Sequence, residues 1–351
     1  MFTRGDQLFG ELLTVLIDKY GRPLLNVRFV ITLRCNFRCI FCHRENSQVC
    51  DSELSPDELS ILAEAFAKVG VRKYKITGGE PLLRDDVVEI VKCLKSYGEA
   101  DDISITTNGF YLREHINKLV EGGLNRINVS LHSLRPSRFE FVTGVNALER
   151  VVLGIKESLN YSLSKIKLNF VALKGVNEDE VWDIIRFAEG LGIHVQLIEL
   201  HPVGRGRDVF SNYYASLSEI LTDLREKAVK IIIRGELHNR PIYVLPSGTT
   251  VEVVRPVLNP IFCAGCSRIR VSPNGALIPC LNSDEVFPTT HIIKEGSCRD
   301  KKVGEVVDLI LRVNNIRRPH ALWPIKSDIE YEYLSLMKLG NTVRKFTLTT
   351  R

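Results

Sequence analysis

The sequence lacks the features that mark several large classes of protein. No apolar run in its 351 residues reaches the roughly 18 that a membrane-spanning helix needs. Its first residues lack the charged-then-apolar pattern of a secretory signal peptide. Its net charge is only +5, which is too small to indicate nucleic-acid binding unless basic side chains converge on one site. We therefore expect a cytoplasmic protein that binds neither a membrane nor a nucleic acid.

Glutamine and methionine are scarce, with three and two residues, as is common in heat-adapted proteins. Cysteine, by contrast, is plentiful, with nine residues. Nine is an odd number, and most of these cysteines fall into two clusters instead of being spaced as a disulfide framework would be. In a reducing cytoplasm, clustered cysteines are typical of metal or redox ligands.

The first two thirds of the chain alternate apolar strands with Gly-rich turns and amphipathic helices. The expected strands are residues 26–33, 72–76, 103–106, 126–130, 165–172 and 193–199. Helices are expected between them, among them 55–69, where Ser55 and Glu58 have the spacing of a capping box, and 85–97. This pattern predicts an α/β fold of the partial (β/α)6 TIM-barrel type, with one composite site at the carboxyl ends of the strands.

The pattern changes after about residue 230. Two hairpins are expected at 242–255 and 268–279, followed by helices near 303–315 and 328–339. We therefore divide the chain into a partial barrel, residues 1–230, and a C-terminal annex, residues 231–351, packed on it.

The first cysteine cluster has the spacing C-x3-C-x2-C, formed by Cys35, Cys39 and Cys42 directly after the first strand. Three closely spaced thiolates suit a four-iron cluster and leave one iron open to a substrate or cofactor. The alternatives are buried structural cysteines, or a zinc site that takes His43 or Cys50 as its fourth ligand. The position at a strand end favours the iron-sulfur cluster.

The second cluster consists of Cys263, Cys266 and, across a Pro-Asn-Gly turn, Cys280. Taken alone, it suits zinc as well as iron-sulfur, because Cys298 or His291 could supply a fourth zinc ligand. Cys93 lies in an amphipathic helix and is expected to be a small core residue. Cys50 and Cys298 receive no role.

The first cysteine motif, together with Gly78-Gly79-Glu80-Pro81 at the second strand end, resembles that of the radical S-adenosylmethionine enzymes. The second cysteine motif, with Arg268 and Arg270 beside it, is similar to that of the GTP 3',8-cyclase family of molybdenum cofactor biosynthesis. The likeness extends over almost the whole chain. It includes Tyr20-Gly21-Arg22, Asn128-Val129-Ser130-Leu131, Lys167-Leu168-Asn169, Lys174-Gly175 and Arg317-Arg318-Pro319.

The resemblance implies two [4Fe-4S] clusters and S-adenosylmethionine as cofactors, with GTP as the substrate. It assigns the residues as follows: Cys35, Cys39 and Cys42 to the first cluster; Cys263, Cys266 and Cys280 to the second; Phe41, Gly79, Ser130 and His201 to S-adenosylmethionine; and Arg28, Lys75, Thr106, Lys167, Arg268 and Arg270 to GTP. Most of the GTP set is basic, as a triphosphate requires. Without the resemblance, Arg28 and Lys75 would be read as solvated or salt-bridged residues, Thr106 and Ser130 as helix caps, and His201 as a structural histidine.

The resemblance also implies the reaction. A cofactor-borne radical is its catalyst, and no side chain is given a catalytic role. A 5'-deoxyadenosyl radical takes the 3' hydrogen of the GTP ribose, and the carbon radical attacks C8 of the guanine. The product would pass to cyclic pyranopterin monophosphate synthase. An external electron donor is needed, and a homodimer is a candidate assembly because members of the family are often dimers.

The chain departs from the family pattern at several positions. Gln196 stands where Arg is usual, Lys75 where Arg is common, His132 where Asp is usual and His201 where Met is usual. Bacterial members end in Gly-Gly, whereas this sequence ends in Thr349-Thr350-Arg351, so either another segment supplies the function of that tail or the activity differs. Two other functions are compatible with parts of this pattern: a two-cluster radical enzyme that modifies a peptide or another small molecule, and a zinc-stabilised module that binds nucleic acid.

Overall fold

The computed structural model describes residues 15–44 and 52–319. Within these residues, all of the named strands join in one sheet with the order β11-β10-β1-β2-β3-β4-β5-β6-β9-β8-β7. The strands are β1 (Asn26–Val30), β2 (Lys73–Thr77), β3 (Asp102–Thr107), β4 (Arg126–Ser130), β5 (Lys165–Ala172), β6 (His194–Glu199), β7 (Lys230–Arg234), β8 (Arg240–Val244), β9 (Thr250–Val254), β10 (Arg268–Val271) and β11 (Leu277–Ile278).

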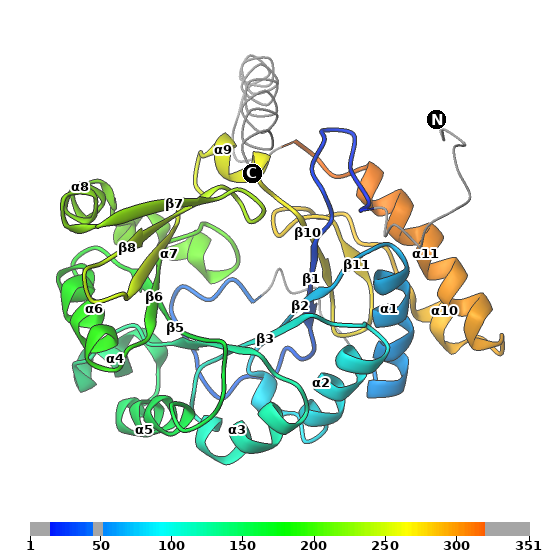
Figure 1. The fold of residues 1–351 in the computed structure, drawn as a ribbon, viewed down its shortest axis with the longest axis horizontal. Helices are drawn as coiled ribbons and strands as arrows, with labels where there is room; N and C mark the ends of the chain where they lie inside the picture. Colours follow the sequence, from blue (N-terminus) through cyan, green and yellow to red (C-terminus); the bar gives the residue numbers. More distant parts are fainter. Residues whose placement is uncertain (1–14, 45–51, 320–351) are drawn as a thin grey trace.

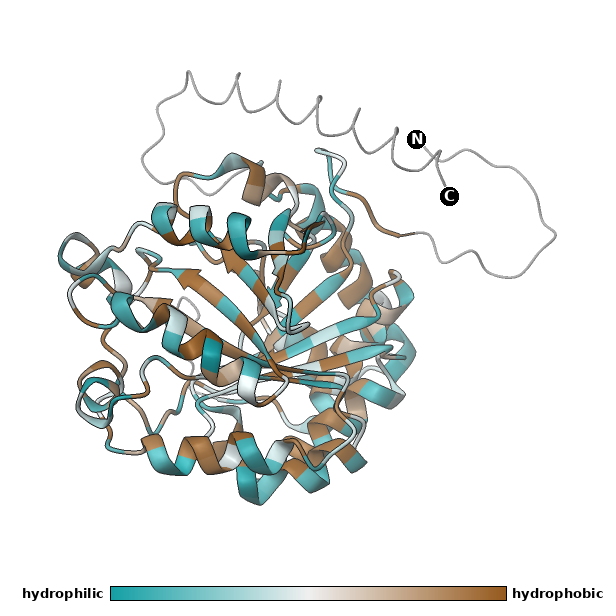
Figure 2. Ribbon diagram, turned by 60° about the vertical axis from the view of Figure 1, so that its left-hand side comes forward, coloured by the Kyte–Doolittle hydropathy of each residue, from teal (hydrophilic) through white to brown (hydrophobic). Residues whose placement is uncertain are grey.

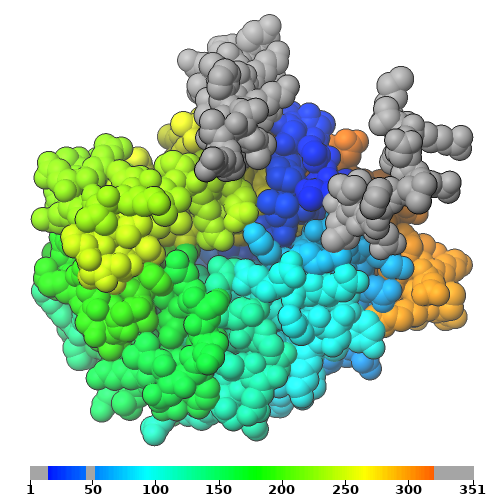
Figure 3. All heavy atoms as spheres, viewed as in Figure 1, coloured from blue at the N-terminus to red at the C-terminus, as the bar shows by residue number. Residues whose placement is uncertain are grey.

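Strands β1 to β6 are all parallel and follow the order of the sequence. They curve around an interior, and the connecting helices lie on the outside (Figure 1). The colours accordingly run around the molecule from blue through cyan and green to lime (Figure 3). The helices are α1 (Pro56–Lys68), α2 (Val87–Ser96), α3 (Leu112–Glu121), α4 (Pro136–Thr143), α5 (Leu148–Ser158), α6 (Val181–Gly190), α7 (Arg205–Tyr213), α8 (Ser218–Lys227), α9 (Pro260–Ala264), α10 (Thr290–Lys294) and α11 (Arg299–Asn315), with 3-10 turns at Pro81–Leu83 and Glu178–Glu180.

The C-terminal region extends this sheet at both ends. Strand β9 pairs parallel with β6, while β10 pairs parallel with β1, so that Asn26 lies beside Arg268. The antiparallel strands β8 and β7 continue from β9, and β11 continues from β10. The sheet thus runs across the boundary proposed near residue 230, and the C-terminal strands form part of the barrel wall.

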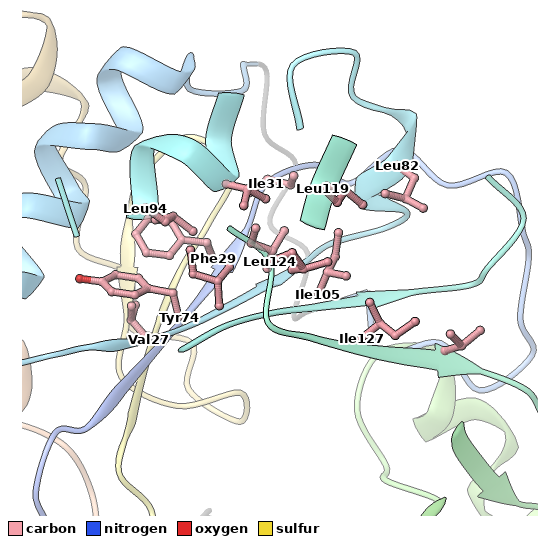
Figure 4. Close-up of a cluster of buried hydrophobic side chains, with 14 of the residues drawn as sticks. Val27, Phe29, Ile31, Tyr74, Leu82, Leu94, Ile105, Leu119, Leu124 and Ile127 are labelled. Carbon is pink, nitrogen blue, oxygen red and sulfur yellow. The ribbon is translucent and has the colours of Figure 1, made fainter. Parts of the chain in front are cut away.

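The core lies between the sheet and the outer helices. Apolar and polar residues are interleaved along the helices, as expected of elements that bury one face (Figure 2). Phe29, Tyr74 and Ile105 from neighbouring strands pack with Leu94 of α2 (Figure 4). The hydroxyl of Tyr74 lies in this core and donates to the backbone carbonyl of Gly98 at 2.9 Å, so its polar atom is not left unpaired.

The predicted α/β partial barrel is confirmed. The observed bounds of β4 and β5 are the predicted ones, and α1 begins with the predicted capping box, because Ser55 accepts from the Glu58 N–H and Glu58 accepts from the Ser55 N–H. The predicted helix near 303–315 is the greater part of α11. The one expected at 328–339 lies outside the described residues, as do Cys50 and residues 349–351.

Candidate active site

A cavity of about 320 Å³ lies inside the barrel, and residues from both ends of the chain line it. All but one of the predicted site residues are among them. They are Arg28, Cys35, Cys39, Phe41, Cys42, Lys75, Gly79, Thr106, Ser130, His201, Cys263, Cys266, Arg268, Arg270 and Cys280. The two cysteine motifs, which are more than 200 residues apart in the sequence, therefore face the same space.

The first cysteine motif occupies the loop that follows β1. The loop is held to the end of α4, because the N–H groups of Arg38 and Ile40 donate to Thr143 and Val142. Backbone N–H groups also point at sulfur: that of Phe37 lies 3.4 Å from Cys35 Sγ, and that of Arg44 lies 3.4 Å from Cys42 Sγ. Such N–H groups stabilise a thiolate and tune the iron it binds.

The Gly78-Gly79-Glu80-Pro81 stretch packs against the start of this loop. A Cβ atom at Gly79 would lie 2.1 Å from the carbonyl oxygen of Arg34, which no side chain tolerates. The fully buried carboxylate of Glu80 accepts from Thr107 Oγ1 at 2.7 Å, the Asn108 N–H at 2.6 Å and the Leu82 N–H at 3.0 Å. Burial raises the pKa of Glu80 to about 7, against the lowering effect of these donors.

Phe41 and His201, two of the residues predicted to contact the cofactor, both line the cavity. Phe41 stands edge to face with His132, with 4.8 Å between ring centroids. His201 Nε2 lies 3.0 Å from Asn282 Oδ1, so this nitrogen carries the proton and Nδ1 is an acceptor. Burial lowers the pKa of His201 to about 4, and its Nδ1 is buried without a hydrogen-bond partner among the described residues. This neutral acceptor can take a hydrogen bond from a molecule bound in the cavity.

A group of cations lines the cavity from β1, β2 and β10. Arg268 and Arg270 are 7% and 8% exposed, and Arg268 Nε donates to Asn26 Oδ1 at 2.7 Å. Burial, followed by the charges of Arg28 and Arg268, lowers the pKa of Lys75 well below its usual value. Thr106 Oγ1 is buried beside them without a partner among the described residues. Buried like charges and an unused hydroxyl indicate a site for a polar anion.

Lys167 is the predicted site residue that lies elsewhere. It lines a second cavity, of about 60 Å³, together with Arg28, Lys75 and Arg268, which face both spaces. Its ammonium is paired with the buried carboxylate of Glu252 on β9. The net effect of burial and this pairing is to lower the pKa of Lys167 to about 8, while the surrounding cations lower the pKa of Glu252 despite its burial.

The second cysteine motif is anchored by two arginines from motifs far apart in the sequence. Arg22 donates to the carbonyl oxygens of Cys263 at 3.2 Å and Arg318 at 2.8 Å, while Arg317 donates to that of Cys266 at 2.6 Å. Burial opposes ionisation of Cys266, but the charges of Arg317 and Arg22 outweigh it and lower its pKa to about 7. The Tyr20-Gly21-Arg22 and Arg317-Arg318-Pro319 motifs thus meet at this loop.

Sequence reasoning missed several residues that line the cavity. They are His238, Arg240, Phe262 and Asn282. The rings of His238 and Phe262 stack with 4.1 Å between centroids, next to Cys263. None of these residues lies at the end of a strand in the parallel series, so the rule that located the other residues could not find them.

The cysteine triplets offer thiolates, the ligands that iron-sulfur clusters take. Among the described residues, no three His, Cys, Asp or Glu side chains come together as ligands for one metal ion. A four-iron cluster binds each thiolate through a different iron and so requires wider spacing. Both cysteine triplets lie beside groups that stabilise a thiolate: backbone N–H groups point at sulfur in the first set, and the charges of Arg317 and Arg22 act on Cys266 in the second.

Comparison with known proteins agrees with this geometry. Residues 29–188 match the model of the radical SAM superfamily, and residues 193–321 match that of the molybdenum cofactor synthesis C-terminal family. Among solved structures, Streptococcus suis SuiB bound to S-adenosylmethionine superposes with a TM-score of 0.60 at 15% identity, covering 80% of this chain and 66% of that one. This likeness shows the fold alone. The match to the family model identifies the chain as a radical S-adenosylmethionine enzyme.

Comparison with individual relatives shows to which family of these enzymes the chain belongs. The proteins of Metallosphaera sedula, Saccharolobus solfataricus and Aeropyrum pernix are 46%, 44% and 40% identical to this chain. The matches cover 90%, 88% and 87% of this chain, and 99%, 100% and 87% of the relatives. Each is named a probable GTP 3',8-cyclase. The chain belongs to the GTP 3',8-cyclase family of molybdenum cofactor biosynthesis, as predicted.

Family membership implies S-adenosylmethionine and one four-iron cluster as cofactors. Across residues 15–44 and 52–319, the structure contains no helix that is long and apolar enough to span a membrane.

Proposed function

We propose that the larger cavity holds GTP and S-adenosylmethionine together, between two [4Fe-4S] clusters. Cys35, Cys39 and Cys42 hold the first cluster, and Cys263, Cys266 and Cys280 hold the second. The observation that carries this proposal is that both cysteine sets line one cavity that also contains a group of buried cations. An enzyme that modified only an uncharged molecule would have no use for that charge.

Four residues on the barrel side bind S-adenosylmethionine in this proposal: Phe41, Gly79, Ser130 and His201. Gly79 lines the cavity just after β2, and its lack of a side chain lets this loop pack against the Arg34 carbonyl beside the first cysteine motif. His201 Nδ1 is the buried acceptor that a donor of the cofactor would satisfy. When bound by these residues and by the first cysteine triplet, the cofactor and the cluster would supply the radical chemistry.

In this proposal Arg28, Lys75, Arg268 and Arg270 of the larger cavity hold the triphosphate of GTP, with Thr106 as an uncharged donor. Lys167 acts from the smaller cavity, which Arg28, Lys75 and Arg268 also line. The guanine faces the second cluster. The protein positions the ribose against the cofactor and excludes water, because an exposed carbon radical would be quenched. Arg268 and Arg270 lie on β10, only a few residues beyond Cys266, and so link the position of the phosphates to that of the second cluster.

The cyclised nucleotide would then pass to cyclic pyranopterin monophosphate synthase. A cytoplasmic location, a homodimer and a boundary near residue 230 between the barrel and the C-terminal region also belong to this proposal. An external one-electron donor would have to reach the first cluster.

The test is anaerobic reconstitution with iron and sulfide, followed by counting iron and measuring 5'-deoxyadenosine with and without GTP. We expect about eight irons per chain, since two four-iron clusters contribute four each, and GTP-dependent formation of 5'-deoxyadenosine and the cyclised nucleotide. The double variant Cys263→Ser/Cys266→Ser should keep about four irons, while Cys298→Ser, at an exposed position before α11, should keep all of them. About four irons with one zinc would contradict the second iron-sulfur cluster. Cleavage of S-adenosylmethionine at the same rate with and without GTP would contradict GTP as the substrate.

A further inference from the structure

Arg240 at the start of β8 is a buried cation that the proposed roles do not yet use. It is 7% exposed and lines both the larger and the smaller cavity. Its Nη1 lies 3.4 Å from Glu252 Oε1, but its Nε is buried with no hydrogen-bond acceptor among the described residues. A buried guanidinium N–H without an acceptor is costly, so the site is incomplete until an acceptor arrives.

The position of Arg240 is fixed from two sides. Glu252 is fully buried on the neighbouring strand β9 and also pairs with Lys167 and, at 3.5 Å, with Arg234. On the other side, the guanidinium lies 5.6 Å from the centroid of the Phe262 ring. A long flexible side chain held in this way loses little further entropy when it binds a ligand.

Arg240 also lines the same cavities as the neutral side chain of Gln196. Gln196 on β6 pairs in register with Glu252 on β9, and Gln196 lines the same two cavities as Arg240. A neutral amide therefore stands at this point of the wall, and a guanidinium arrives from the adjacent hairpin. Arg28 and Lys75, from β1 and β2, also line both cavities.

We propose that Arg240 binds the triphosphate of the substrate and supplies, from β8, the guanidinium that Gln196 lacks on β6. Glu252 is then a positioning residue, because it touches Arg240 and Lys167 instead of the substrate. The inference rests on the proposed GTP site. It predicts that Arg240 discriminates GTP from guanosine, since a contact confined to the phosphates contributes nothing to binding of the nucleoside.

The experiment compares equilibrium binding of GTP and of guanosine to anaerobically reconstituted wild-type enzyme and Arg240→Gln. We expect the variant to bind GTP tenfold to 100-fold more weakly and guanosine within about twofold of wild type, because one charge-assisted hydrogen-bond partner is lost. Adding Gln196→Arg to Arg240→Gln should restore most of the GTP affinity. Arg186→Gln is the matched control, because Arg186 lies exposed on α6, where it pairs with Asp183.

The variant should fold, since Glu252 keeps Lys167 and Arg234 as partners. Iron content and thermal unfolding check this, and Arg240→Lys, which keeps a positive charge beside Glu252, should bind GTP more tightly than Arg240→Gln. Unchanged GTP affinity in Arg240→Gln, or equal weakening of GTP and guanosine, would overturn the role of Arg240. Failure of the wild-type enzyme to bind GTP would instead overturn the proposed function itself.

Discussion

The hydroxyl of Thr107, at the end of β3, donates a 2.7 Å hydrogen bond to the buried carboxylate of Glu80, in the loop after β2. This contact ties together two strand ends that border the cavity. It also explains why a glutamate follows the two glycines: the carboxylate collects three donors that would otherwise be buried without acceptors.

Replacement of Glu80 tests this account. Glu80→Ala leaves the Thr107 hydroxyl and two backbone N–H groups unpaired, so we expect it to lower the free energy of unfolding of the apoprotein by about 3 kcal/mol or more. Thr107→Val, which removes one of the three donors, should cost about 1–2 kcal/mol. Urea unfolding under reducing conditions gives both values. Glu114→Ala, which breaks an exposed pair with Arg150, should cost no more than about 1 kcal/mol. Equal costs for Glu80→Ala and Glu114→Ala would contradict the prediction.

Gly79 permits the close approach of two loops, and Gly79→Ala tests it. Because the new Cβ would collide with the Arg34 carbonyl, the loop before Cys35 must shift, and we expect S-adenosylmethionine cleavage to fall about 100-fold. The matched control is Gly304→Ala on the exposed side of α11, where no atom lies within 4 Å of the added Cβ. That change should leave cleavage intact and stabilise the protein by about 0.5–1 kcal/mol. Normal cleavage by Gly79→Ala would show that the loops are not in tight contact.

The buried side chain of His132 makes the stability of the protein depend on pH. Burial lowers its pKa to about 3, and its Nδ1 accepts a hydrogen bond from the Val171 N–H at 3.2 Å. Because the pKa in the folded state lies below that of the unfolded chain, His132 contributes stability above about pH 6.5 that is lost as the pH falls towards 3. At pH 4.5 the loss is about 3 kcal/mol.

The measurement is the free energy of unfolding of the apoprotein between pH 7 and pH 4.5. His132→Gln keeps an acceptor for the Val171 N–H but does not titrate, so its acid loss should be smaller than that of wild type by about 3 kcal/mol. His291→Gln, at an exposed position on α10, should follow the wild-type curve. Parallel curves for His132→Gln and wild type would mean that His132 is not held neutral.

Arg317 joins three segments near the second cysteine motif. It is 2% exposed, donates to the Cys266 carbonyl and lies 3.4 Å from the buried Asp18. We expect Arg317→Ala to cost about 3 kcal/mol of unfolding free energy and to reduce the iron bound after reconstitution from about eight to about four. Its neighbour Arg318 is half exposed and pairs loosely with Glu285, so Arg318→Ala should cost less than about 1 kcal/mol. Full iron loading of Arg317→Ala would contradict the anchoring role.

Most of the barrel could be predicted from the sequence because each strand and helix has a local signal. Strands β4 and β5 are apolar runs with clear ends, and Ser55 caps its helix by local chemistry. Strand β7 was not predicted. Its three isoleucines are exposed at the edge of the sheet, so its pattern lacks the alternation of a half-buried strand.

The candidate site was predicted in part from strand ends and in part from the resemblance. Neither could place Lys167 beside Glu252, because that pair depends on β9 returning to lie beside β6 after an excursion through two helices and a hairpin. The same non-local pairing brings Arg240 inside the barrel. Contacts of this kind are set by topology, and no local pattern in the sequence encodes them.

The parallel pairing of β1 with β10 has a consequence for the order in which the molecule assembles. Strand β1 is complete once residue 30 has been synthesised, but its partner on one side arrives only with residues 268–271. A nascent chain must therefore carry β1 with one edge unpaired for most of translation, which invites association with other strands. Because the first cysteine loop follows that strand, the strand that precedes it is paired on both edges only after β10 has been made.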